Sequence, residues 1–179
     1  MRKKHKLFCA FPLLFTCDCY IIILKWSKVP QNGRKGRKKA MLMGKYPHSI
    51  DSKNRLIIPS KLKEQLGSTI TIIKDAERCL CVYSAEEWAS YTAKINELPK
   101  SKAREIVRFL YANAVEVQPD GQGRVVLPQD MIEYAGITKN VVTVGCGKYV
   151  EIWAEEKWNE MKLSDEPEDF AATLELLGL

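Results

Sequence analysis

The sequence is poor in the residue types and motifs on which most catalytic sites depend. It has two histidines, and His48 is the only one after residue 40. It contains no Gly-rich phosphate loop, no Gly-x-Ser-x-Gly motif and no paired-carboxylate motif. His48 falls on a predicted strand, where a single histidine is more often packed or hydrogen-bonded than catalytic. These absences argue against an enzyme, so we expect no catalytic residue, no metal and no cofactor.

Cysteine is present, but without the spacing of a zinc site or a disulfide framework. Residues 1–40 hold three of the six cysteines, and Cys79, Cys81 and Cys146 lie in the remainder without a C-x-x-C pair. Cys79 and Cys81 alternate along a predicted strand, so we expect buried, inert thiols and a reducing compartment. Gly145-Cys146-Gly147 fits a tight turn between strands better than it fits a nucleophilic cysteine.

The positive net charge comes from the first forty residues. The whole chain carries a net charge of +6. Residues 1–40 hold eleven basic side chains and one acidic side chain, whereas residues 41–179 hold 17 basic and 21 acidic ones. The body is therefore mildly acidic, and any contact that it makes with nucleic acid must use a local basic surface.

Residues 1–40 admit three interpretations. Their basic start and the apolar run Leu7–Leu24 suggest a signal peptide or membrane anchor, but Pro12 and Asp18 interrupt that run. A basic DNA-binding arm is the second interpretation. The third is that translation starts at about Met41, because the Lys- and Arg-rich stretch before it can be encoded by purines, as in a ribosome-binding site. We favour the third, and we therefore expect an untranslated extension and no membrane association.

One phrase occurs twice in the chain. Residues 51–59 read DSKNRLIIP, and residues 120–128, which lie 69 positions later, read DGQGRVVLP. Both copies have the pattern D-x-x-[N/G]-R, then three aliphatic residues, then proline. An internal repeat indicates a fold built from two copies of one unit. We expect the two units to pack around a pseudo-two-fold axis.

The repeated phrase predicts a turn, a short buried strand and the start of a helix. The aspartate can accept backbone N–H bonds across the turn, and asparagine or glycine tolerates a positive φ at the fourth position. Proline ends the strand and opens the helix. We therefore predict structural roles in the turn for six residues: Asp51, Asn54, Pro59, Asp120, Gly123 and Pro128.

Each unit continues with two more strands and a helix that carries a tryptophan. In the first unit Ser84-x-x-Glu87 is a capping box, and Trp88, Tyr91, Ile95 and Leu98 share one face of the helix that follows. Four short strands cannot bury a core alone, so we expect the units to interleave and the chain to oligomerise.

The predicted fold is α+β and mainly β, with the two units forming one barrel-like structure. The predicted parts are an extension (1–40), a first unit (41–98), a connecting helix with an apolar stripe that includes Ile106 (99–113), a second unit (114–161) and an acidic amphipathic C-terminal helix (162–179).

Three basic residues of the repeat are candidates for ligand binding. Lys53, Arg55 and Arg124 lie at or beside the turns, where their donors can project toward a ligand. Phosphates and guanine edges are acceptors that such donors recognise. An arginine beside a hairpin also pairs commonly with an acidic residue. The motif alone therefore leaves both a DNA-binding and a structural role open.

The segment Met41–Pro59, MLMGKYPHSIDSKNRLIIP, closely resembles the start of MraZ proteins, a family of bacterial transcriptional regulators, and residues 120–128 match that family's second copy. The resemblance spans residues 41 to about 177. It implies tandem SpoVT-AbrB-like swapped-hairpin units in a ring-shaped homo-oligomer. It also implies sequence-specific binding to double-stranded DNA, at direct repeats in the promoter of the division and cell-wall gene cluster, which includes its own gene. Repression and a cytoplasmic, nucleoid-associated location are the corresponding expectations.

The family's basic motif residues match Lys53 and Arg55 in the first copy and Arg124 in the second. Gln122 stands at the place of Lys53, so we expect the first copy to bind DNA more strongly. Asn54 replaces the usual glycine, which its tolerance of positive φ makes minor. The alternative function is a scaffold or antitoxin-like module with the same fold and no promoter binding.

Overall fold

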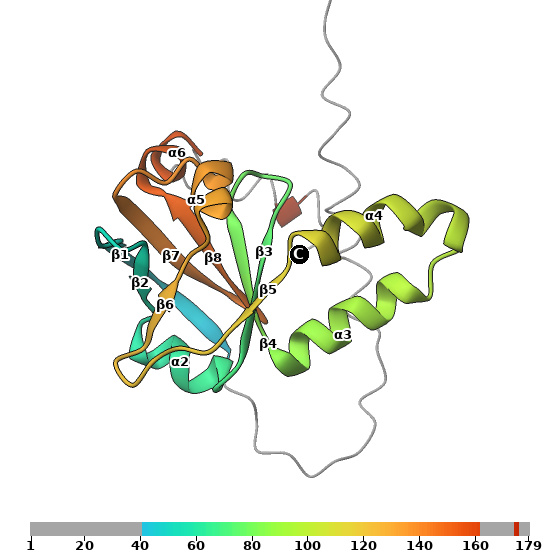
Figure 1. The fold of residues 1–179 in the computed structure, drawn as a ribbon, viewed down its shortest axis with the longest axis horizontal. Helices are drawn as coiled ribbons and strands as arrows, with labels where there is room; N and C mark the ends of the chain where they lie inside the picture. The colour runs from blue at the N-terminus through green and yellow to red at the C-terminus, as the bar shows by residue number, and fades with distance from the viewer. Residues whose placement is uncertain (1–40, 162–173, 176–179) are drawn as a thin grey trace, which may run out of the picture. The chain divides into compact units, whose positions relative to one another are not determined.

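The computed structural model of the chain describes residues 41–161 and 174–175 (Figure 1). The predicted extension at residues 1–40 and most of the predicted C-terminal helix lie outside the described residues. None of the helices in the described part has the length and apolarity that crossing a membrane requires.

The same order of elements occurs twice along the chain, as the repeat predicts. The first series is β1 (Leu42–Ser49), β2 (Arg55–Ile57), α2 (Ser60–Leu66), β3 (Ile70–Lys74), β4 (Leu80–Ser84) and α3 (Ala85–Asn96). After α4 (Lys100–Ala112), the second series is β5 (Val115–Val117), β6 (Arg124–Val126), α5 (Gln129–Ala135), β7 (Asn140–Gly147), β8 (Tyr149–Ala154) and α6 (Glu155–Glu160).

Strands of the two series pair with each other. A six-stranded antiparallel sheet has the order β1-β7-β8-β4-β3-β5, and β2 and β6 form a separate two-stranded ribbon. If each strand is exchanged for its equivalent in the other series, the β1–β7 pair becomes the β5–β3 pair. The β4–β8 and β2–β6 pairs are then each converted into themselves. The predicted interleaving and pseudo-two-fold symmetry are therefore confirmed, as is the α+β, mainly β fold class.

The sheet buries a different cluster of side chains on each face. Successive residues of a strand point to opposite faces: Ile72 belongs to a first cluster, whereas Ile73 belongs to a second. The first cluster also contains Leu56 and Val125 of the ribbon, and the second lies against residues of α3, α4 and α6. In Figure 1 the ribbon and the α3–α4 pair accordingly lie to opposite sides of the sheet.

The second cluster holds the thiols that the sequence places on one strand face. Cys79 and Cys81 are 1% and 2% exposed, as predicted for small buried residues. Their mutual hydrogen bond, followed by burial, raises the pKa of Cys81 well above its usual value. A thiol with a raised pKa is a poor nucleophile because the thiolate is the reactive form.

The helices next to this cluster show where the sequence pattern was right and where it was wrong. The Ser84 hydroxyl accepts a hydrogen bond from the Glu87 N–H at 3.3 Å, as a capping serine does. Trp88, Tyr91 and Ile95 pack against the second cluster as expected. The prediction for Leu98 is wrong: α3 ends at Asn96, and Leu98, two residues later, is exposed.

Candidate nucleic-acid interface

The first copy of the repeat folds into a turn closed by Asp51. Its Oδ1 atom accepts hydrogen bonds from the backbone N–H groups of Lys53 and Arg55, at 2.8 and 3.0 Å. The Asp51 carbonyl accepts another from the Asn54 N–H at 3.0 Å. Asn54 has a φ of 58°, in the left-handed region that asparagine tolerates. One side chain therefore satisfies two backbone donors, and the turn has a defined shape.

The second copy repeats this geometry. Asp120 Oδ1 accepts hydrogen bonds from the N–H groups of Gln122 and Arg124, at 2.8 and 2.9 Å. Gly123 has a φ of 80°, and a Cβ atom there would lie 3.3 Å from the carbonyl oxygen of Ile58. Glycine at this position therefore avoids both the backbone strain and the close approach of the other unit.

The prolines that end the two copies stand immediately before the helices. Pro59 and Pro128 have φ angles of −52° and −58°, and they directly precede α2 and α5. The carbonyl of Pro59 accepts hydrogen bonds from the N–H groups of Leu62 and Lys63, both at 2.9 Å. Because proline has no backbone N–H, neither strand continues past its proline, and the helix next to the turn begins directly after it.

Each arginine of the repeat forms an ion pair with the aspartate of its own turn. Arg55 Nε lies 2.6 Å from Asp51 Oδ2, and Arg124 Nε lies 2.7 Å from Asp120 Oδ2. The two arginine side chains are 33% and 31% exposed. A guanidinium group has five N–H donors, and these ion pairs occupy only part of them. The aspartates thus fix the position of the arginines without enclosing them.

The same contacts keep both aspartates ionised. The backbone N–H of Arg124, followed by its side chain, lowers the pKa of Asp120 to about 2. The backbone N–H of Arg55 is likewise the main cause that lowers the pKa of Asp51. Both carboxylates therefore stay ionised, and paired with their arginines, to a lower pH than an ordinary aspartate would.

The ribbon brings the two copies together. In its register Arg55 is opposite Val126, Leu56 is opposite Val125, and Ile57 is opposite Arg124. Leu56 and Val125 point into the first cluster and are 0% and 2% exposed. The alternating residues therefore share the other side of the ribbon, which we call the ribbon face: Arg55, Ile57, Arg124 and Val126.

Two lysines from the first unit lie beside the ribbon face. Lys53 is exposed at the first turn, and no partner of its ammonium group is found within residues 41–161. Lys63 of α2 donates a hydrogen bond to the carbonyl of Asp120 at 3.1 Å. Sequence reasoning missed Lys63, because only the interleaving of the units brings α2 to the second turn. The second turn has Gln122 at the place of Lys53, and Lys63 of the first unit therefore supplies a lysine there.

The residues considered for catalysis lack the features of activated groups. His48 Nε2 and Thr143 Oγ1 share a hydrogen bond of 2.6 Å, and burial lowers the pKa of the imidazole. Burial raises the pKa of Cys146 to about 12, opposite to the shift that a nucleophilic thiol needs. In the described ranges, no three side chains that commonly bind metals come together.

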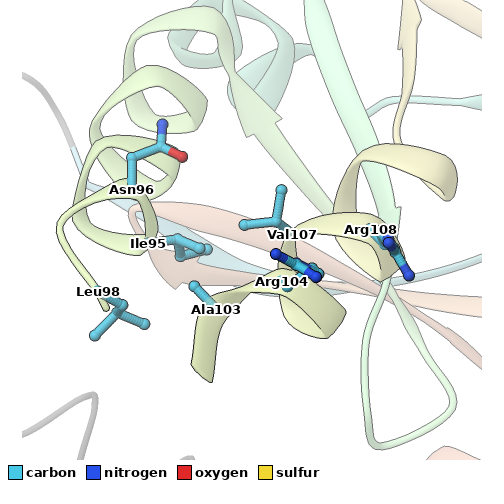
Figure 2. Close-up of a pocket in the computed structure, with 7 residues that line it drawn as sticks. All are labelled: Ile95, Asn96, Leu98, Ala103, Arg104, Val107 and Arg108. Atoms are coloured by element: carbon cyan, nitrogen blue, oxygen red, sulfur yellow. The ribbon is translucent and has the colours of Figure 1, made fainter. Parts of the chain in front are cut away.

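A second surface lies on the α3–α4 pair, away from the ribbon. A groove of about 410 Å³ is lined by apolar side chains, one asparagine and two arginines (Figure 2): Ile95, Asn96, Leu98, Ala103, Arg104, Val107 and Arg108. Beyond the groove α4 exposes more apolar side chains. Ile106, which the sequence placed in an apolar stripe, is 48% exposed, and Phe109 and Tyr111 are exposed to a similar extent.

Comparison with known proteins gives consistent matches. The model of the family described as "MraZ protein, putative antitoxin-like" matches residues 41–108 and 110–176. A relative from Clostridium acetobutylicum is 45% identical over 122 residues, which cover 67% of this chain and 86% of that protein. One from Acetivibrio thermocellus is 42% identical over 144 residues, which cover 78% of this chain and 100% of that protein. Both relatives carry the name transcriptional regulator MraZ.

Proposed function

The chain belongs to the MraZ family, and from this premise we propose that it is a DNA-binding transcription regulator that contacts DNA with the ribbon face and the two flanking turns. The observation that carries the proposal is the pairing of the two copies. Arg55 and Arg124 come from different units, yet they share one outward face, and each is held by its own aspartate.

This face suits the major groove of B-DNA. The groove admits a two-stranded β-ribbon, and arginine can bind the O6 and N7 atoms of guanine with two N–H groups. Lys53 and Lys63, which lie beside the face, suit phosphate oxygens, which fix the position of a protein on the duplex. Fixing each guanidinium before binding reduces the side-chain entropy that binding would otherwise remove.

One chain gives a weak electrostatic contact, because the body is acidic and the local cations are few. We therefore place the function in a ring-shaped homo-oligomer that presents the same face several times. Linked contacts raise the affinity through effective concentration, provided that the repeats in the DNA match the spacing of the subunits. The corresponding targets are direct repeats in the promoter of the division and cell-wall gene cluster, with repression as the outcome.

The exposed apolar residues of the α3–α4 pair supply the surface for this self-association. Ile106 and Phe109 are about half exposed on α4 although they are large and apolar. Helix α4 lies on the side of the sheet opposite the ribbon (Figure 1), so subunit contacts through α4 leave the ribbon face open to DNA.

Salt-dependent binding to DNA tests the proposal against a protein-interaction module. We expect the full chain to retard DNA from directly upstream of its own coding sequence in an electrophoretic mobility-shift assay at low salt. The logarithm of the association constant should fall with the logarithm of salt concentration with a slope of about −0.9 per neutralised phosphate. A scrambled fragment of equal length and composition is the control. If the chain binds neither fragment at low salt, the result favours the alternative function, a protein-interaction module.

A further inference from the structure

The ribbon face exposes two aliphatic side chains between its arginines. Each copy of the repeat has three aliphatic residues in a row, and in both copies the middle one faces outward. Ile57 is 54% exposed and Val126 is 58% exposed, whereas Leu56 and Ile58 on either side of Ile57 are 0% and 1% exposed. Val126 is equivalent to Ile57 by the 69-residue repeat. The exposure is thus a property of the repeated unit and is not confined to one position.

The register places each aliphatic side chain beside an arginine of the other copy. Ile57 is opposite Arg124, and Val126 is opposite Arg55. Directly opposed residues of an antiparallel pair lie about 4.5–5.5 Å apart. The two arginine–aliphatic pairs are two residues apart along the ribbon, which is about 7 Å. The face therefore carries two equivalent cation–aliphatic pairs separated by about two base-pair steps of 3.4 Å.

The major groove offers one apolar group that matches this pattern. The C5-methyl group of thymine is the apolar feature of its base edges, and it lies beside acceptors that arginine binds. Resting on the proposed DNA-binding function, we infer that Ile57 and Val126 contact thymine methyl groups next to the bases or phosphates bound by Arg124 and Arg55. Each arginine–aliphatic pair then selects a thymine close to its arginine contact.

A second copy of the chain would fit the ribbon face less well than DNA does. A subunit interface there would have to remove water from two arginine–aspartate ion pairs, and removing charges from water is costly. A DNA groove supplies acceptors for the same arginines. The mixed character of the ribbon face, with two cations and two aliphatic groups, therefore favours the base edges of DNA.

The test removes only the methyl groups from the DNA. The fragment from upstream of the chain's own gene is prepared once with thymine and once with uracil in every thymine position, and binding is measured by mobility shift. We expect the wild-type chain to bind the thymine fragment more tightly, by about threefold or more per contacted methyl group. The double variant Ile57→Ser, Val126→Ser, which leaves no methyl group at either position, should bind both fragments equally, near the wild-type affinity for the uracil fragment.

The control variant is Met43→Ser, which removes an exposed apolar side chain from β1 and should keep the wild-type preference for thymine. Equal binding of the wild type to both fragments overturns the thymine contact and leaves the DNA-binding proposal intact. The thymine contact is also overturned if the double variant keeps the full preference for thymine. It is likewise overturned if the double variant no longer elutes as an oligomer in size-exclusion chromatography. If the wild type binds neither fragment, the proposed function and this inference both fail.

Discussion

Replacing Arg55 by alanine is expected to abolish the mobility shift of DNA from upstream of the chain's own gene, while the oligomer persists. A specific arginine contact contributes about 1–3 kcal/mol, and the substitution removes it from every subunit at once. It also leaves the Asp51 carboxylate without its cation, beside a polyanion. The loss should therefore exceed that of a single contact.

The fold should survive this substitution. Asp51 keeps its hydrogen bonds to the backbone N–H groups of Lys53 and residue 55, which do not depend on the arginine side chain. The double variant Asp51→Asn, Arg55→Ala then separates the two causes of the loss. It should recover part of the affinity, because the repulsion between Asp51 and the phosphates is gone while the contact of Arg55 is still missing.

Lys148→Ala is a charge-matched control. The β1–β7 register places Leu42 opposite Gly147 at one end and Ser49 opposite Asn140 at the other. Lys148 and Asp51 therefore lie next to opposite ends of this strand pair, which are about 24 Å apart. We expect Lys148→Ala to bind DNA like the wild type. Unchanged binding by Arg55→Ala would remove Arg55 from the interface.

Phe109→Glu is expected to break the oligomer and to weaken DNA binding about a hundredfold or more. Phe109 is 46% exposed on α4, so the change should not disturb the fold of one chain. It would place a carboxylate where the proposed subunit contact buries an apolar ring, at a large desolvation cost. Because linked sites gain 10²–10⁴ in affinity from effective concentration, losing the linkage removes about that factor.

Size-exclusion chromatography with light scattering measures the first effect, and a mobility shift measures the second. Phe109→Leu retains an apolar side chain and should preserve both the oligomer and the affinity. An oligomer of unchanged mass in Phe109→Glu would show that self-association does not use this part of α4.

The order of elements and the symmetry of the fold could be predicted because their signals are local and repeated. The turn residues, the prolines and the Ser84 cap each act within a few positions of the chain. The strand partners could not be read from the sequence, because the pairing of β1 with β7 depends on packing between units that are distant along the chain.

The candidate site was predictable in its members but less so in their arrangement. Lys53, Arg55 and Arg124 stay predictions as DNA contacts, and the ion pair of each arginine with its own aspartate was one of the two roles that the sequence left open. The sequence did not indicate which of three aliphatic residues faces outward, since each is equally apolar. It also did not indicate that Lys63 reaches the second turn, because that contact joins the two units.

Protection of arginines by DNA tests most directly whether the two copies of the repeat form one DNA-binding face. The full chain is treated with phenylglyoxal, with and without DNA from upstream of its own gene, and modified arginines are located by mass spectrometry. We predict that DNA protects Arg55 and Arg124 together, whereas Arg104 and Arg108 beside the α3–α4 groove react as in the free protein. Equal modification of Arg55 and Arg124 with and without bound DNA would contradict this account.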